Sequence, residues 1–307
     1  MPDKLLTIFT APKPFTDPHI AAIQHNALLS WSRLDPRVEV LLMGDEAGIG
    51  EAAKAHGMRH IRQVRCNQLG TPLISSMFEL TRKQSESTFL AIVNTDILLF
   101  PDILAAIAVA AKRFDKFVLA GQRWDVEISE RLSWKTNFFA IMRKRIRLEG
   151  TQHPPMGSDY FVFPRLCYTD VPEFAIGRAG WDNWMIFKAR WENWALIDST
   201  EDIFVAHQQH DYRHLPNGQP HYRLPESKIN LQLAGGDHTI FTLCDANYRL
   251  ENGDIHSQRL NPRKFWREVE ILPLTCWHSH GMARCFHYFF HPIKAYQNFR
   301  RWLRKVD

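Results

Sequence analysis

Residues 88–101 read TFLAIVNTDILLFP, and this stretch decides how the whole sequence is interpreted. The apolar run Phe89 to Val93 is typical of a buried strand, and Asn94 and Asp96 interrupt a segment that is otherwise apolar. Burying a carboxylate at the end of such a strand is costly unless a charge or hydrogen bonds compensate it. In open α/β sheets the ends of strands are where ligands bind. A divalent cation carrying a phosphorylated ligand would compensate Asp96, so we expect the chemistry here.

A β-turn or a helix cap is the alternative interpretation of Asn94-Thr95-Asp96, because Asn and Asp are common at both. The flanking residues, Ile92-Val93 and Ile97 to Leu99, are too apolar for an exposed turn. This favours Asp96 as a direct metal ligand, with Asn94 reaching a ribose or a metal-bound water.

Length and composition predict a globular protein with a large core. The chain has 307 residues, of which 45% are hydrophobic. No apolar run reaches the roughly 18 to 20 residues that span a bilayer, and Met1 to Lys4 does not begin a secretory leader. The five cysteines never form C-x-x-C, which argues against a disulfide framework or a zinc ribbon. We therefore expect a cytoplasmic protein, either free or peripheral on the cytoplasmic face of a membrane.

The positive charge is concentrated at the C-terminus. Residues 284–307 carry a net charge of +5, which equals the formal charge of the whole chain, so the rest is balanced. A balanced body argues against nucleic-acid binding. The basic residues of the segment alternate with aromatic ones, which suits contact with an anionic membrane surface. A terminal helix docked on the body with a solvated basic face is the alternative.

Strands and helices alternate through the first part of the chain, which predicts βαβ units and a mostly parallel sheet flanked by helices. Strands are expected at 4–10, 38–43, near 61, at 89–93 and at 117–120, and helices at 18–34, 51–56, 72–84 and 102–113. Beyond residue 123 we expect a polar helix at 129–148, a strand at 160–163, a Trp-rich helix from 181, and strands near 196 and 204. We predict an α/β body over 1–255 and a basic, aromatic helical appendage over 256–307.

A histidine cluster, HQQHDYRH, occupies residues 207–214. Neutral imidazole is a common metal ligand, so we expect His207 or His210 to reach a bound cation. A polar loop with solvated histidines is the alternative.

Two further carboxylates precede regular elements. Asp182, in GWDNW, lies at the first turn of an expected helix, so it could cap that helix or act as a general base beside indoles that stack on sugars. Trp181 and Asn183 are therefore candidate substrate contacts. Asp159 precedes an apolar strand, where it could bind sugar hydroxyls or form a turn.

Six motifs together resemble the GT-A-fold nucleotide-sugar glycosyltransferases, particularly bacterial enzymes of glycan assembly. The motifs are TIFTAP at 7–12, NQLGTPL at 67–73, NTD at 94–96, GSDYFVF at 157–163, AGWDNWM at 179–185 and HQQHDY at 207–212. The resemblance covers about residues 4–250. It implies a GT-A-like catalytic domain over 1–255, with a nucleotide-binding half at 1–122 and an acceptor half at 123–255.

The resemblance also implies roles for particular residues. Asp96 with Asn94 would bind the metal and the diphosphate, Asp182 would be the base of an inverting enzyme, and His207 or His210 would complete the metal shell. The positions expected to face the nucleotide are Thr10, Ala11, Asp45 and Asn67. This sequence has Asn94 where the family's motif has its first acidic residue, which leaves one carboxylate for the metal.

The resulting hypothesis is a glycosyltransferase assisted by Mn²⁺ or Mg²⁺. It would move a sugar from a nucleotide-diphosphate donor to a hydroxyl of a glycan or lipid-linked acceptor. A non-catalytic glycan-binding module that uses the tryptophans, and a metal-dependent hydrolase that uses the cluster at 207–214, are the alternatives.

Overall fold

The computed structural model describes residues 4–210, 221–297 and 300. In chain order its helices and strands are β1 (Leu6–Thr10), α1 (Pro18–Trp31), β2 (Val38–Met43), α2 (Ile49–His56), β3 (Arg59–Ile61), α3 (Ile74–Gln84), β4 (Phe89–Val93), β5 (Ile97–Leu99), α4 (Asp102–Arg113), β6 (Phe117–Ala120), β7 (Trp124–Val126), α5 (Phe138–Glu149), β8 (Thr151–Gln152), β9 (Tyr160–Pro164), α6 (Trp181–Trp191), β10 (Ala195–Asp198), β11 (Val205–Gln208), α7 (Pro225–Leu233), β12 (Tyr248–Glu251), β13 (Asp254–Ser257), α8 (Pro262–Thr275) and α9 (His280–Phe290).

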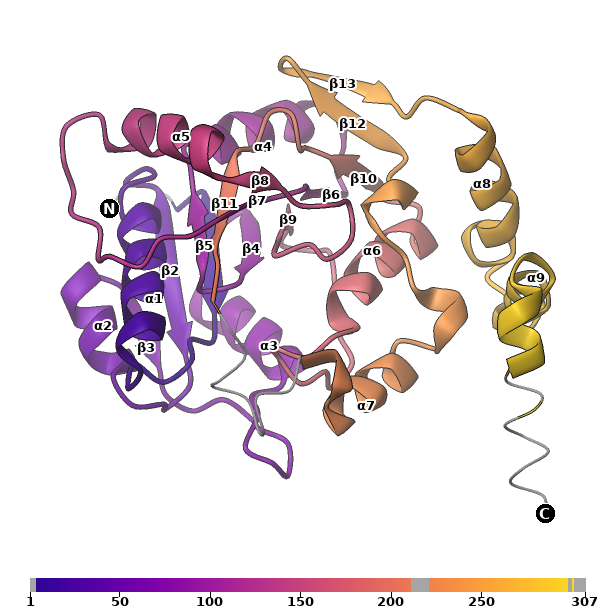
Figure 1. Cartoon of the computed structure of the whole chain (residues 1–307), viewed down its shortest axis with the longest axis horizontal. Coiled ribbons are helices and arrows are strands. Elements are labelled where there is room, and N and C mark those ends of the chain that lie inside the picture. The colour runs from indigo at the N-terminus through magenta and orange to yellow at the C-terminus, as the bar shows by residue number, and fades with distance from the viewer. Residues whose placement is uncertain (1–3, 211–220, 298–299, 301–307) are drawn as a thin grey trace.

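A mixed, mostly parallel sheet forms the centre of the molecule (Figure 1). Its strand order within the described residues is β13-β12-β10-β6-β9-β4-β1-β2-β3. The pairs are parallel except where β9 lies antiparallel between β6 and β4 and where β13 closes a hairpin with β12. The predicted α/β class, with a mostly parallel sheet flanked by helices, is confirmed. Strands from both 1–122 and 123–255 build this one sheet, so the two expected halves share a core.

Helices cover both faces of the sheet because its strands are apolar on both sides. On β4, Ala91 and Val93 face one core, together with side chains from α1, α2 and α4. Leu90 and Ile92 face the other core, which α3 and α6 cover. Successive side chains of β4 point to opposite faces of the sheet, and each face packs against its own set of helices.

The apolar stretch after Asp96 belongs to a second sheet. In the sequence, residues 97–99 stand out only as apolar, and in the structure β5 separates from the main sheet and pairs antiparallel with β11. The second sheet has the order β5-β11-β7-β8, and α5 covers it with Phe138, Met142 and Ile146. Asn94-Thr95-Asp96 is therefore the short connection where the chain passes from one sheet to the other.

Helix boundaries follow local signals where a cap is present. Asp17 caps α1 by accepting from the Ile20 N–H, with Pro18 in the first turn, as the sequence indicates. The prediction of a helix over 129–148 is wrong in its first half, since α5 begins at Phe138. Residues 129–137 are polar and form irregular chain, although they contain no proline. The residue before α5, Asn137, makes no side-chain cap.

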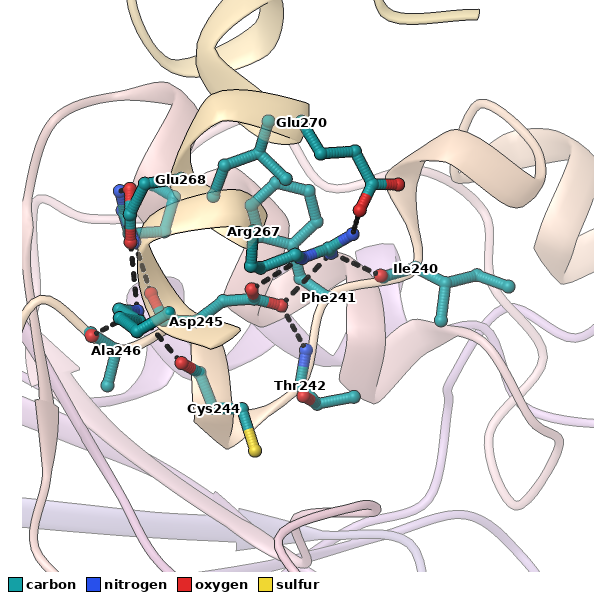
Figure 2. Close-up of polar contacts among 12 residues, drawn as sticks. Ile240, Phe241, Thr242, Cys244, Asp245, Ala246, Arg267, Glu268 and Glu270 are labelled. Carbon is teal, nitrogen blue, oxygen red and sulfur yellow. Dashed lines mark hydrogen bonds and ion pairs between the residues drawn. The ribbon is translucent and has the colours of Figure 1, made fainter. Parts of the chain in front are cut away.

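The two C-terminal helices lie at one side of the molecule, beyond α6 (Figure 1). Ile271 and Leu274 of α8 are buried in the core that α6 lines. Figure 2 shows Arg267 of α8 reaching the buried carboxylate of Asp245, with Nε 2.8 Å from Oδ1. The appendage is thus docked on the body, and β13 crosses the expected boundary at residue 255. Within the described residues, no helix is both long and apolar enough to cross a membrane.

Candidate functional site

Asp96 lies next to three nitrogen-bearing side chains. Its Oδ2 atom is 3.2 Å from His210 Nε2, 3.9 Å from His207 Nε2 and 3.9 Å from Lys13 Nζ. The side chains of Asp96, His207 and His210 are 14%, 17% and 9% exposed. Most of the cluster is therefore buried, and a small part of each side chain reaches solvent. Both imidazoles lie close to Asp96, and the sequence prediction that one of them reaches a bound cation stays a prediction.

The other carboxylate oxygen of Asp96 has no hydrogen-bond partner among the residues that the structure describes. Oδ1 is buried and makes no hydrogen bond within the described chain. Burial by itself would raise the pKa of Asp96, but the hydrogen bond from His210 and the charges of His207 and Lys13 hold that pKa well below its ordinary value. The group is therefore a buried carboxylate with one unused acceptor, which is the state a cation ligand needs.

His207 is oriented by a second carboxylate. Its Nδ1 atom is 3.1 Å from Asp125 Oδ1, so its Nε2 atom faces Asp96. A carboxylate behind an imidazole fixes the ring and its tautomer in metal sites. Burial lowers the pKa of His207, but Asp125 and Asp96 outweigh it and raise the pKa above its ordinary value. The same negative potential attracts a cation.

A chain of polar contacts links Asp125 to the turn that carries Asp96. Arg123 Nε donates to Asp125 Oδ1 over 2.8 Å, and the guanidinium also pairs with Asp159. Asn94 Nδ2 in turn donates to Asp159 Oδ1 over 2.8 Å. Asn94 and Asp159, both predicted to contact ligand, therefore hold each other, and they brace the turn at its first residue.

Asp182 lies at the first turn of α6, where Gly180 takes a φ of 107° that a side chain would disfavour. The Gly180 N–H donates to Asp182 Oδ1 over 3.3 Å. Burial and the nearby charge of Asp159 raise the pKa of Asp182 to about 6, although backbone N–H groups of the helix start oppose them. Through Asp159 the carboxylate is electrostatically coupled to the contacts that hold the Asp96 turn.

The four positions expected to face a nucleotide have different surroundings. Thr10 Oγ1 is buried and hydrogen-bonded to Thr95 Oγ1 over 2.9 Å, so it braces the turn, and Ala11 packs against the core. Asn67 closes its own loop and donates to Glu226 over 2.6 Å. Asp45 is exposed and paired with Arg62. A nucleotide contact by any of these residues stays a prediction.

The burial of Trp181 argues against the expected contact with a sugar, which stays a prediction. Trp181 is 4% exposed and packs edge-on against Phe161, with ring centroids 5.8 Å apart, so its indole belongs to the core. Asn183 is half-buried and donates to the Phe241 carbonyl over 2.7 Å, which satisfies part of its amide. Aromatic residues at helical spacing fit a core as well as they fit a sugar platform, and here the core explains Trp181.

Three residues of the site were missed by sequence reasoning. Lys13 follows β1 and approaches His210 Nε2 to 3.2 Å, while Asp125 and His153 pair over 2.7 Å on the second sheet. Each is a single polar residue on a loop or short strand, without a motif. The position of Lys13 three residues after a strand end was the one available signal. Asp211 and His214, part of the predicted histidine cluster, lie outside the described residues.

The residues present fit a divalent cation. Asp96 supplies an unpartnered buried oxygen, and His207 and His210 each turn a ring nitrogen toward Asp96 so that the ligand atoms lie within 4.8 Å of one another. A mixed carboxylate and imidazole set suits Mn²⁺ and other first-row divalent ions. Asn94, whose amide is engaged by Asp159, lies at the edge of this set.

No protein-family profile and no curated protein matches the sequence. The chain is similar in fold to glucosyl-3-phosphoglycerate synthase from Mycobacterium tuberculosis in complex with Mn²⁺, UDP and glucosyl-3-phosphoglycerate. The identity is 13%, the match covers 84% of this chain and 88% of that chain, and the TM-score is 0.46.

Two other solved structures match over shorter spans. TarS 1–349 from S. aureus has 13% identity over 67% of this chain and 58% of its own, with a TM-score of 0.39. The mannosyltransferase PcManGT from Pyrobaculum calidifontis, in complex with GDP-Man and Mn²⁺, has 10% identity over 67% of this chain and 57% of its own, with a TM-score of 0.41. At these identities and TM-scores, the similarity by itself assigns no activity to the chain.

Proposed function

We propose that this protein is a glycosyltransferase that moves a sugar from a nucleotide-diphosphate donor to a hydroxyl group of a glycan or lipid-linked acceptor. The observation that carries the proposal is the unpartnered buried oxygen of Asp96, held beside two imidazoles where the chain crosses between two sheets. The resemblance to GT-A glycosyltransferases supports this, because it implies that Asp96 binds the metal and the donor diphosphate and that His207 or His210 completes the metal shell.

Asp96, His207 and His210 would hold the divalent cation. When bound, Mn²⁺ or Mg²⁺ would neutralise the diphosphate that leaves from the sugar. Lys13 adds a positive charge at the same place, since its Nζ atom is 3.9 Å from Asp96. The Lys13 side chain is 34% exposed, and its amino group would pair with a phosphate oxygen of the donor when a cation is bound at Asp96.

Asp182 is the candidate general base. In the transfer, the acceptor oxygen bonds to the anomeric carbon, the bond from that carbon to the diphosphate breaks, and the acceptor proton passes to a carboxylate. A base works best when its pKa lies near the working pH, and the pKa of Asp182 is raised to about 6. The coupling of Asp182 to Asp159 supports its place at the same site.

A panel of nucleotides tests the proposal against the two alternatives. We expect one of UDP, GDP or CDP to raise the melting temperature, and Mn²⁺ to enlarge that shift, because ligand binding to the folded state stabilises it. The measurement is thermal unfolding of the full chain with and without Mn²⁺. Stabilisation by metal alone would instead fit a hydrolase built on Asp96 and the histidines, and no effect of either would fit a glycan-binding module.

We also propose that the C-terminal helices contact an anionic membrane surface, where a lipid-linked acceptor would be found. Large apolar side chains are exposed on and beside these helices. They are Phe265, Trp266, Trp277, Met282, Tyr288, Phe289, Ile293 and Tyr296. Arg284, Lys294 and Arg300 are exposed in the same segment, a combination that favours the membrane interface. The further predicted contributors Arg301, Trp302, Arg304 and Lys305 lie outside the described residues.

Deleting residues 284–307 is expected to abolish sedimentation with anionic liposomes. Because the deletion removes much of α9, a finer variant replaces Phe289 and Ile293, which are 79% and 74% exposed, by Ser. We expect the double variant to bind anionic liposomes at least several-fold more weakly and to keep its melting temperature. Unchanged sedimentation of both variants would rule out this surface as the membrane contact.

A further inference from the structure

We propose that Glu270, His287 and His291 form a second metal-ion site, suited to Zn²⁺, at the junction of α8 and α9. The three residues share no member with the Asp96 cluster, and no part of the proposed glycosyl transfer requires them. Glu270 lies on α8, His287 lies on α9, and His291 is the C-cap residue that follows Phe290 at the end of α9. A bound ion would fasten α9 to α8.

The ligand atoms converge on one point. Glu270 Oε1 is 3.2 Å from His287 Nδ1 and 3.0 Å from His291 Nε2, and all three atoms lie within 4.8 Å of one another. Two ligand atoms on one Zn²⁺, each bound at about 2.0 to 2.1 Å with tetrahedral angles, lie about 3.3 Å apart. Small movements of the side chains would therefore admit the ion between them.

The helix supplies the two imidazoles from one face. His287 and His291 are four residues apart, the spacing that brings side chains together on a helix, and their ring centroids are 4.5 Å apart. His287 is 6% exposed and fixed, whereas the side chain of His291 is 40% exposed. The site therefore has a buried wall and one side open to solvent, through which an ion can arrive.

Arg267 orients the carboxylate. Its guanidinium bridges Glu270 and the buried Asp245, with Nη1 3.0 Å from Glu270 Oε2 (Figure 2). That contact occupies Oε2 and leaves Oε1 for the histidines. The guanidinium therefore fixes the direction of the Glu270 carboxylate, while Lys294 adds a positive charge near His287.

The ligand set suits zinc. Two imidazoles and one carboxylate occur in Zn²⁺ sites that keep a fourth position for water. The Asp96 cluster offers the same donor types, so the test has to separate the two sites by position. The alternative is that both imidazoles donate hydrogen bonds to Glu270 and no ion binds. The side chains lie in the same positions in both cases, so only a measurement of metal binding distinguishes the two.

The test uses the full chain carrying Asp96→Asn, stripped of metal with a chelator, so that the first cluster is disabled. Zn²⁺ is titrated by calorimetry, and Co²⁺ by visible absorption, which reports the coordination geometry. We expect one equivalent of Zn²⁺ to bind and to raise the melting temperature. His291→Ala in the same background should weaken binding at least tenfold and remove the shift.

Two variants make the result specific. Glu270→Gln keeps the shape of the side chain and should weaken Zn²⁺ binding comparably, which covers the case in which His291→Ala folds poorly. His256→Ala, which removes an exposed histidine of β13, should change neither affinity nor melting temperature. In the otherwise wild-type chain, His291→Ala should keep Mn²⁺-dependent nucleotide binding. A negative result for the zinc site is therefore distinguishable from a negative result for the proposed function. Absence of Zn²⁺ binding in the Asp96→Asn chain, or equal affinity in all three variants, would overturn the proposal.

Discussion

Replacing Asp96 by Asn is expected to abolish metal-enhanced nucleotide binding and to lower the rate of glycosyl transfer by on the order of a thousandfold. Asn keeps the shape of the side chain but removes the charge that attracts a cation, and Asp96 is the one carboxylate that the described part of the chain contributes to this cluster. The measurements are the thermal shift with nucleotide and Mn²⁺, and the release of nucleoside diphosphate over time. The folded state should persist, because Asn can still accept from His210.

Asp115→Asn is the matched control. Asp115 lies between α4 and β6, its side chain is exposed, and it plays no part in the proposed site. Surface substitutions usually change stability little, so we expect the melting temperature and nucleotide binding to stay the same. Equal loss in the two variants would show that the effect of Asp96→Asn is general and not one of metal binding.

Replacing Asp182 by Asn is expected to lower transfer by roughly a hundredfold to ten-thousandfold while donor binding is retained. Asn cannot accept the acceptor proton, yet it preserves the size of the side chain and its contact with the Gly180 N–H. The measurements are the transfer rate and the nucleotide-induced thermal shift of the same sample. Turnover at the wild-type rate would remove Asp182 from the mechanism.

The same variant should change the pH dependence of stability. The pKa of Asp182 is raised from 3.8 to about 6 in the folded protein, so the folded state binds a proton that the unfolded state has lost between those values. The contribution of this group to stability is therefore present below pH 4 and is lost as the pH rises through about 6. Asp182→Asn should be more stable than wild type at pH 8 by about 3 kcal/mol, and the two should converge near pH 4. Denaturant unfolding at both pH values measures this, and an equal difference at both would refute the raised pKa.

The sequence predicted the central sheet because its signals are local. The run Phe89 to Val93 is buried throughout, as five apolar residues in a row require when helices cover both faces. Asp17 and Pro18 marked the start of α1 by capping chemistry alone. The same run predicted that Asn94 and Asp96 follow the end of a strand, and therefore that Asp96 lies at the edge of the sheet.

The second sheet could not be predicted in this way. β5 pairs with β11, whose residues lie more than a hundred positions along the chain, and no local pattern reports that contact. Its three residues, Ile97 to Leu99, look the same whether they continue a strand or cross to another sheet. Asp125 and Lys13 were missed for a related reason, since the pairing of distant segments makes them neighbours of His207 and His210.

Trp181 shows a different limit. Its position beside Asp182 fitted a sugar platform, but a Trp at helical spacing with Trp184 and Met185 fits a core equally well. Only the packing of α6 on Phe161 decides between them. Residue type and spacing predicted which elements carry the site, whereas the direction of each side chain needed the fold.

The most direct test of the account is a crystal structure of the full chain soaked with Mn²⁺ and, in turn, UDP, GDP and CDP, with anomalous scattering used to locate manganese. The account predicts one Mn²⁺ bound by Asp96 and at least one of His207 and His210, with the nucleotide diphosphate on the opposite side of the ion. Manganese bound elsewhere, or a diphosphate held away from Asp96, would contradict it.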